Sequence, residues 1–193
     1  MLDPPLLISR SLVRIQQGSP PLLANAASGV DAMARSAEPS LVLTFLSRMG
    51  LAEAETYPLT GRFLKGRLRR AMSDSEKALV ESLVESTQRY KEPARLLARG
   101  ELAEQATLVI EGLVTRTIYQ EGRRFIVGLQ VPGDFADLNG FALKRLDHDI
   151  VTLGNILVGF VPHARLEQVL ADNPEVTRLL WFASLVDAAI HRQ

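Results

Sequence analysis

The chain has 193 residues, of which 47% are hydrophobic and 23% charged, a composition typical of a folded protein with one well-developed core or two small ones. Its 22 lysines and arginines balance 22 aspartates and glutamates, which argues against a globally basic nucleic-acid binder. Cysteine is absent, which excludes disulfides, thiolate metal sites and cysteine nucleophiles, and no apolar run reaches the roughly 18 residues that span a bilayer.

The N-terminal region shows no sustained apolar period. Residues 1–38 mix paired prolines with small residues and predict a disordered leader, although a start codon placed too far upstream would leave the same pattern. Prolines and arginines interrupt the apolar centre that a secretory signal needs, so the cytoplasm is the expected location. Residues 39–72 predict a helical lead-in, with a helix at Pro39–Met49 and a basic stretch at Phe63–Met72 that favours a solvated helix flank over a nucleic-acid contact.

A capping box marks the next helix. Ser73 and Glu76 stand three residues apart in the Ser-x-x-Glu pattern, in which each side chain satisfies a backbone N–H of the first turn. The apolar stripe that follows, with period 3.6, predicts an amphipathic helix over Asp74–Thr87. The members of this stripe are Leu79, Val80, Leu83 and Val84.

After this helix the pattern changes to short apolar runs separated by glycine turns. Runs at intervals of roughly ten residues predict an antiparallel sandwich or barrel. Short helices are expected at Leu138–Leu143 and His163–Leu170. The predicted strands are Arg89–Leu97, Ala106–Ile110, Leu113–Tyr119, Arg124–Val131, Ile150–Leu153 and Ile156–Val161.

The last predicted element is a long helix. Asn173, Pro174 and Glu175 form a strong helix start, with a capping residue, a proline at the first helical position and an acid in the first turn. Its apolar surface is wider than one contact with the barrel requires. No stop signal precedes Gln193, so we expect 173–193 to be a truncated copy of a longer helix.

Three glycine turns stand in a characteristic order: Leu108–Gly112 (LVIEG), Glu121–Arg124 (EGRR) and Pro132–Phe135 (PGDF). With the later stretch DLNGFALKRLDHDIVTLG, they make the chain from about Phe63 to Gln193 resemble the sensor domain of Crp/Fnr-type transcription regulators. The resemblance implies an α+β fold, in which 73–172 form an antiparallel β-roll of the double-stranded β-helix (jelly-roll) type. Helices would flank the roll, and a dimerisation helix would follow it.

The resemblance also implies partners. Members of the family form homodimers through the long helix and bind DNA through a helix-turn-helix domain that follows it. This sequence stops before such a domain, so contact with DNA is expected only through a domain that is not present, and no membrane is involved. The expected dimer interface consists of Leu179, Leu180, Ala183, Val186 and Ile190.

A ligand pocket is implied at the turn around Phe135. In cyclic-nucleotide-binding members a glutamate holds the ribose, and an arginine followed by Ser or Thr holds the phosphate. Here the glutamate position falls on Leu138, the arginine pair falls near His148-Asp149, and the aspartates around them would repel a phosphate. The sequence therefore predicts an unknown small-molecule effector, with an ordinary cyclic nucleotide possible but disfavoured. The candidate pocket is Gly133, Asp134, Phe135, Asp137, Leu138, Asn139, His148 and Asp149.

Other interpretations stay open. The aspartates Asp134, Asp137 and Asp149 are of the type that caps turns and helices without binding a ligand. A regulatory module that does bind a cyclic nucleotide is one alternative function, and a standalone dimerisation module is another. A cupin-like barrel enzyme is the third, but it needs several histidines around a metal, and the chain has only three, none with His-x-His spacing in a strand. We predict no catalysis, with His148 as the best candidate for a ligand contact.

Overall fold

The computed structural model describes residues 53–64 and 67–190, and the predicted leader 1–38 and helix Pro39–Met49 lie outside these ranges. The described strands form two antiparallel sheets. One has the order β1-β7-β3, with β1 at Ser86–Tyr90, β7 at Ile156–Pro162 and β3 at Gln105–Glu111. The other has the order β2-β6-β4-β5, with β2 at Arg95–Leu97, β6 at Asp149–Thr152, β4 at Val114–Gln120 and β5 at Arg123–Gln130.

The two sheets pack face to face and enclose one part of the core. Side chains from both sheets fill the space between them, as in a β-sandwich. β3 is buried along nearly its whole length, whereas β5 at the edge of its sheet is mostly exposed. The buried apolar residues between the sheets include Val109, Val114, Ile150, Ile156 and Val158.

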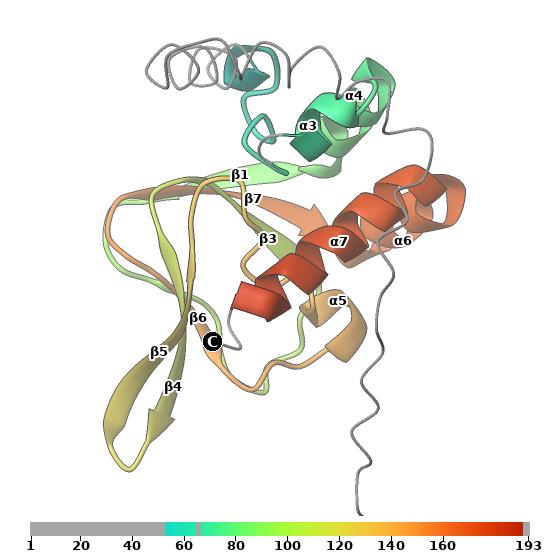
Figure 1. Cartoon of the computed structure of the whole chain (residues 1–193). Coiled ribbons are helices and arrows are strands. Elements are labelled where there is room, and N and C mark those ends of the chain that lie inside the picture. Colours follow the sequence, from blue (N-terminus) through green and yellow to red (C-terminus); the bar gives the residue numbers. More distant parts are fainter. Residues whose placement is uncertain (1–52, 65–66, 191–193) are drawn as a thin grey trace, which may run out of the picture. The chain divides into compact units, whose positions relative to one another are not determined.

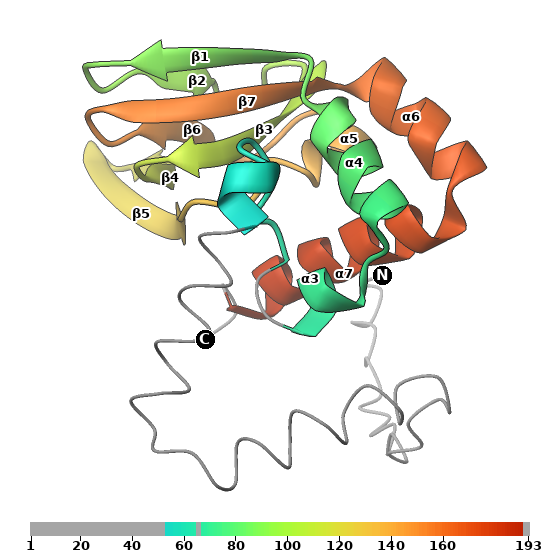
Figure 2. The same cartoon turned by 90° about the horizontal axis from the view of Figure 1, so that it is seen from above.

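Helices complete the domain on one side of the roll, where α4, α6 and α7 lie next to one another (Figures 1 and 2). They are α3 (Arg67–Ala71), α4 (Asp74–Leu83), α5 (Gly140–Leu143), α6 (His163–Asp172) and α7 (Pro174–Ile190). Their buried side chains form a second core cluster with the roll, which includes Val80, Leu83, Leu108, Leu166 and Leu180. The predicted fold class, an antiparallel β-roll flanked by helices with a C-terminal helix, is confirmed.

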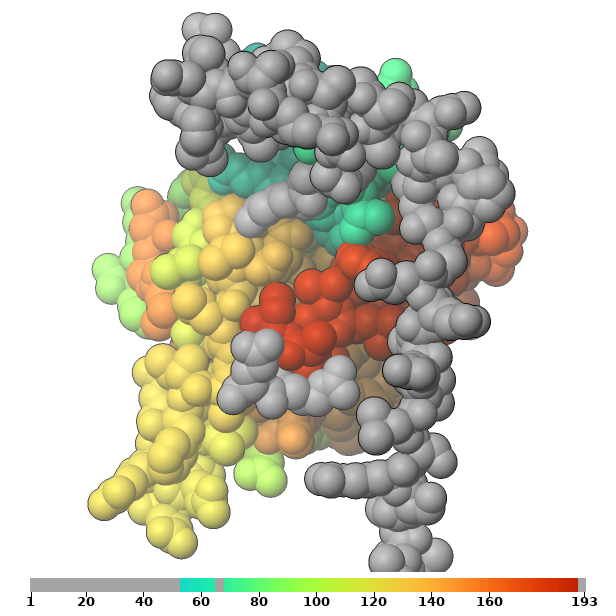
Figure 3. Space-filling model, in the orientation of Figure 1, coloured from blue at the N-terminus to red at the C-terminus, as the bar shows by residue number. Residues whose placement is uncertain are grey.

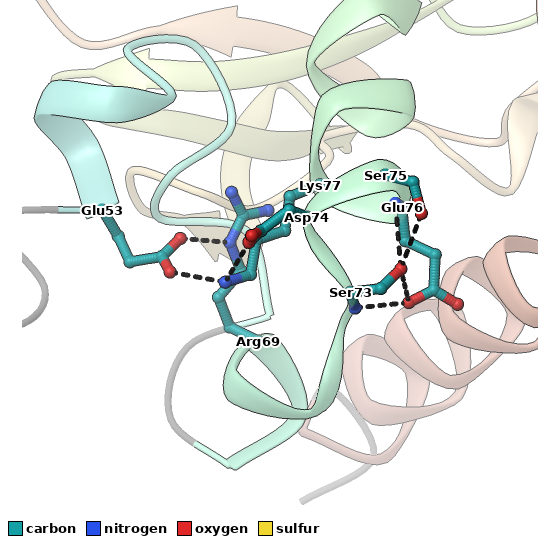
Figure 4. A network of polar contacts seen from close by, with 7 residues as sticks. All are labelled: Glu53, Arg69, Ser73, Asp74, Ser75, Glu76 and Lys77. Atoms are coloured by element: carbon teal, nitrogen blue, oxygen red, sulfur yellow. Dashed lines mark hydrogen bonds and ion pairs between the residues drawn. The ribbon is translucent and has the colours of Figure 1, made fainter.

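The capping box at the start of α4 is present as predicted (Figure 4). The Ser73 hydroxyl accepts from the backbone N–H of Glu76 at 3.2 Å, and Glu76 Oε2 accepts from the backbone N–H of Ser73 at 2.6 Å. The predicted end of this helix at Thr87 is wrong, because α4 ends at Leu83 and the chain turns into β1. Pairing with β7, with Ser86 opposite Phe160, outweighs the local helical pattern.

The strand predicted at Arg89–Leu97 is two strands. Pro93 lies between them, and a proline cannot donate a ladder hydrogen bond. β1 pairs with β7 in one sheet, and β2 pairs with β6 in the other, so the chain crosses between sheets at this proline. The short helix predicted from Leu138 begins two residues later, at Gly140.

The basic stretch before α4 is not only a solvated flank. The Arg69 side chain is buried, with 3% of the residue exposed, and its Nε donates to Glu53 Oε2 at 3.1 Å (Figure 4). Lys77 Nζ donates to the other oxygen of Glu53 at 2.8 Å, and the Arg69 guanidinium lies over the ring of Tyr57. One carboxylate therefore ties the lead-in segment to α3 and α4.

Candidate functional site

A cavity of about 300 Å³ lies between the roll and the last turns of α7. Its floor comes from the turn after β5, at 133–135, and from Leu138 and Asn139 just before α5. α7 contributes Phe182, Ala183, Val186 and Ile190 among others, and the lead-in contributes Arg62 to Leu64. Ligand sites are commonly concave and mostly apolar with a few convergent polar groups, and this cavity has that character.

The turn at the cavity floor is held in shape by backbone contacts with β3. Gly133 N donates to Val109 O at 2.8 Å, and Val109 N donates to Asp134 O at 2.9 Å. The Asp134 carboxylate closes the turn by accepting from Val131 N at 3.0 Å. Gly133 adopts a φ of +97°, and a Cβ there would lie 2.1 Å from the backbone oxygen of Arg62. Only glycine therefore fits this position without a shift of the backbone.

Asp137, a predicted pocket residue, does not line the cavity. It is buried, with 2% of the residue exposed, and accepts from the backbone N–H of Thr107 at 2.5 Å and from the Thr107 hydroxyl at 2.9 Å. Burial raises the pKa of Asp137 to about 6, although these hydrogen bonds and the nearby charge of Arg116 oppose the increase. Its visible role is to tie the segment before α5 to β3.

His148 and Asp149, also predicted for the pocket, lie away from the cavity as well. Asp149 Oδ1 accepts from Arg99 N at 2.7 Å, which fastens the start of β6 to the segment after β2. His148 Nδ1 lies 2.7 Å from Asp147 Oδ1, and this hydrogen bond holds the pKa of Asp147 below its usual range. Of the three aspartates interpreted as caps of turns and helices, Asp134 closes its own turn, whereas Asp137 and Asp149 accept from backbone N–H groups of distant segments.

The structure thus brings together five of the eight predicted pocket residues. Asn139, one of the lining residues, has a buried Oδ1 atom with no hydrogen-bond partner among the described residues. Whether these residues bind an effector stays a prediction. The five that line the cavity are Gly133, Asp134, Phe135, Leu138 and Asn139.

Sequence reasoning missed two of the charged residues that line the cavity, Arg116 on β4 and Asp187 on α7. Arg116 has 7% of its surface exposed; its Nε donates to Ala136 O at 2.8 Å and its Nη1 donates to Asp187 Oδ2 at 2.5 Å. Gln130 Nε2 also lies 3.5 Å from Asp187 Oδ1. One available signal was that Asp187 is the only charged residue in the apolar second half of α7.

The charges that line the cavity balance. Arg62 and Arg116 contribute two positive charges, and Asp134 and Asp187 contribute two negative charges. Arg116 lies at the inner side with only 8% of its side chain exposed, whereas 28% of the Asp187 side chain is exposed. The pair therefore joins a fixed, buried cation of the roll to an anion at the solvent edge.

The predicted dimer residues do not share one side of α7. Leu179 and Leu180 are buried in the chain's own core, at 6% and 3% exposure, because the first half of α7 packs against the roll. Leu179 and Leu180 therefore pack inside their own chain and not at its surface. Ala183 is half-buried, and the dimer interface itself stays a prediction. Part of α7 lies at the surface (Figure 3). Its exposed large apolar side chains are Trp181, Phe182, Leu185, Val186 and Ile190.

Other site chemistry is sparse in the described ranges. His163, the first residue of α6, is buried and packs edge-on against Phe141. Burial lowers its pKa, and the positive charge of Lys144 adds to this.

Among the residues that the structure describes, no group of three or more His, Asp or Glu side chains is placed to hold a metal ion. No helix in the same ranges is long and apolar enough to cross a membrane.

Residues 87–173 match the family model described as cyclic nucleotide-binding domain, whereas no curated protein matches the chain. Similar solved structures include the N-terminal domain of a transcriptional regulator from Streptomyces coelicolor, with 17% identity, 68% of this chain and 92% of that chain covered, and a TM-score of 0.55. The catabolite activator protein of Thermus thermophilus is similar at 16% identity, with 66% of this chain and 59% of that chain covered and a TM-score of 0.55.

The c-di-GMP-responsive global regulator CLP of Xanthomonas campestris is similar at 19% identity, with 59% of this chain covered and a TM-score of 0.52. The alignment spans 58% of the length of that regulator. Identities this low establish a shared fold. The segment that matches the cyclic nucleotide-binding domain model and the β-roll fold around it agree with the resemblance to Crp/Fnr-type sensor domains.

Proposed function

We propose that the chain is the ligand-sensing and dimerising part of a Crp/Fnr-type transcription regulator, without catalytic activity, and that its effector is not an ordinary cyclic nucleotide. The observation that carries the proposal is the position of the cavity between the sensor turn at 133–135 and the last turns of α7. A molecule bound there would contact both the roll and the helix with the exposed apolar side chains. If the molecule made more favourable contacts with one position of α7 than with another, its binding would shift the helix toward that position.

The polar groups of the cavity support an effector other than a cyclic nucleotide. Leu138 stands where a ribose-binding glutamate was expected, and it lines the cavity without a polar group. The buried cation Arg116 is already neutralised by Asp187. A cyclic nucleotide would have to displace Asp187 from Arg116, and it would find no polar group for its ribose at Leu138, so the ribose hydroxyls would lose hydrogen bonds to water without replacement there.

Isothermal titration calorimetry of the full chain with cyclic AMP and cyclic GMP tests this. We expect dissociation constants no tighter than about 1 mM, which corresponds to about 4 kcal/mol of binding free energy. A micromolar constant for either nucleotide would show that the conventional ligand is bound. It would then favour the second candidate, a cyclic-nucleotide-binding regulatory module, which the family match over 87–173 supports.

The proposed dimerisation depends on the exposed side of α7. Trp181 and Leu185 are 66% and 52% exposed, four residues apart on one side of the helix, and an apolar helix surface of this kind is typical of a packing seam. Sedimentation velocity over a concentration series should show a dimer for the wild type and a monomer for Leu185→Glu. The control is Leu102→Glu, at a leucine that is 47% exposed and lies outside α7. A wild-type chain that stays monomeric at high micromolar concentration would contradict the proposal.

A further inference from the structure

The ion pair between Arg116 and Asp187 occupies the polar end of the cavity. Arg116 is anchored in the roll, because its Nε is bonded to Ala136 O at 2.8 Å and its side chain is 8% exposed. Asp187 comes from α7, 71 residues further along the chain. Of the two partners, the carboxylate is the one that can leave, since it is closer to solvent and belongs to the helix that covers the cavity.

A buried guanidinium needs an anionic or strongly polar partner. Removing one member of a buried ion pair is strongly destabilising, because the other charge is left without compensation. An anionic ligand that reaches Arg116 would therefore compete with the carboxylate already paired with it. In the present structure that carboxylate belongs to Asp187, which Gln130 Nε2 also faces at 3.5 Å.

We infer that Asp187 is a built-in competitor for the anionic group of the effector. The effector class is an organic anion, with a carboxylate or phosphate that takes the place of Asp187 on Arg116 and an apolar body that fills the space lined by Phe135, Leu138 and Val186. This inference rests on the proposed sensing function of the cavity. It adds the chemistry of the ligand and the bond that the ligand breaks.

The exchange explains how occupancy of the cavity reaches α7. When a bound anion pairs with Arg116, the last turns of α7 lose the ion pair that fastens them to β4. A neutral ligand of the same shape leaves the pair intact and gives no such release. Displacing Asp187 from Arg116 costs free energy, and this cost is the coupling free energy between binding in the cavity and release of the helix. An anion that binds to a variant without the Asp187 charge does not meet this cost, so the variant should bind anions more tightly but not neutral ligands.

A matched pair of fluorescent probes tests this selectivity. 8-Anilinonaphthalene-1-sulfonate is an apolar anion, and N-phenyl-1-naphthylamine is the same aromatic body without the sulfonate. Asp187→Asn is expected to bind the anionic probe at least about tenfold more tightly than the wild type, because a charge-assisted hydrogen bond contributes about 1.5 to 3 kcal/mol and tenfold corresponds to about 1.4 kcal/mol. Binding of the neutral probe should change little.

Two controls separate this effect from general charge. Glu175→Gln removes an α7 carboxylate that pairs with Arg178 at the surface, where the two side chains are 64% and 68% exposed, and should leave the affinity for the anionic probe unchanged. Adding Arg116→Gln to Asp187→Asn should abolish the gain. The inference is overturned if the wild type and Asp187→Asn bind the anionic probe with equal affinity or if neither binds it. It is also overturned if Glu175→Gln gains affinity for the anionic probe, or if Asp187→Asn gains affinity for the neutral probe.

A measurement on the wild-type chain covers the case in which the variants do not fold. Amide hydrogen exchange in the last turns of α7, around 184–190, should become faster with the anionic probe bound at saturation and not with the neutral probe. Unchanged exchange with the anionic probe bound overturns the inference. The probe and exchange experiments test the competition between Asp187 and an anion, whereas the cyclic-nucleotide titrations and sedimentation test the proposed function. Either of the two can therefore be contradicted without the other.

Discussion

Asp137→Asn gives the sharpest test of how the segment before α5 is held. Asp137 is buried and bonded to the backbone N–H and the hydroxyl of Thr107, and burial raises its pKa to about 6 against an ordinary value of 3.8. An asparagine keeps the shape and can accept from the N–H and donate to the hydroxyl. The substitution therefore removes the charge and leaves the contacts to β3 in place.

The direction and size of the effect come from the two pKa values. Because the folded pKa lies above the unfolded pKa, the folded protein takes up this proton first as the pH falls, so the contribution of Asp137 to stability increases from pH 6 to pH 4. Above pH 6 the buried charge costs about 3 kcal/mol relative to pH below 4, at about 1.36 kcal/mol for each pKa unit. Asp137→Asn should therefore gain about 2 to 3 kcal/mol relative to the wild type between pH 4 and pH 7.5.

Urea unfolding of the wild type and Asp137→Asn at a series of pH values measures this difference directly. The exposed aspartate Asp172, at the end of α6, supplies the control variant Asp172→Asn, for which the difference from the wild type should not vary with pH in this way. A difference between wild type and Asp137→Asn that stays constant from pH 4 to pH 7.5 would refute the reasoning. A change in the opposite direction would show that the hydrogen bonds from Thr107 outweigh burial.

Two further predictions concern single contacts. Gly133→Ala should lower the free energy of unfolding by more than about 2 kcal/mol in thermal or urea unfolding, because φ is +97° and the new Cβ would lie 2.1 Å from Arg62 O. The control is Gly122→Ala, at φ +73° with no atom within 4 Å of the new Cβ, which should lower it by only about 1 kcal/mol through backbone strain. A smaller loss at the first glycine than at the second would contradict the contact. Glu53→Gln should cost about 2 kcal/mol at pH 7 and little at pH 3. Burial pushes the pKa of Glu53 up, but hydrogen bonds from Lys77 and Arg69 outweigh it and hold this pKa below 4.5, so the contribution is present at neutral pH and lost as the pH falls through that folded value. Equal losses at both pH values would argue against the paired carboxylate.

Features governed by neighbouring residues could be predicted from the sequence. The capping box of Ser73 and Glu76 depends on residues three apart, and the turn at Gly133 depends on a local demand for positive φ, so both were accessible without the fold. The alternation of short apolar runs likewise predicted the roll. The end of α4 was not accessible, because the chain leaves the helix to pair with β7, a strand some 70 residues further on, and local periodicity carries no information about that partner.

The candidate site could be predicted only where it is made by one continuous turn. Residues 133–135, with Leu138 and Asn139, line the cavity as a consequence of their sequence order. Arg116 and Asp187 meet across 71 residues, and neither stands in a motif. The side of α7 that faces the core could not be predicted for a different reason: the helix is apolar nearly all round, so its sequence does not indicate which side packs against the roll.

The exposed edge strand β5 has a consequence for how copies of the chain meet during folding. Its run 125–129 (FIVGL) is uncharged, rich in strand formers and without proline, and it lies at an open end of the sheet order β2-β6-β4-β5. Such an edge is a template for strand pairing between chains and so for aggregation. Arg123 and Arg124 begin the same strand, so two copies stacked in parallel register would bring like charges together. These two arginines act as gatekeepers that oppose self-association at this edge.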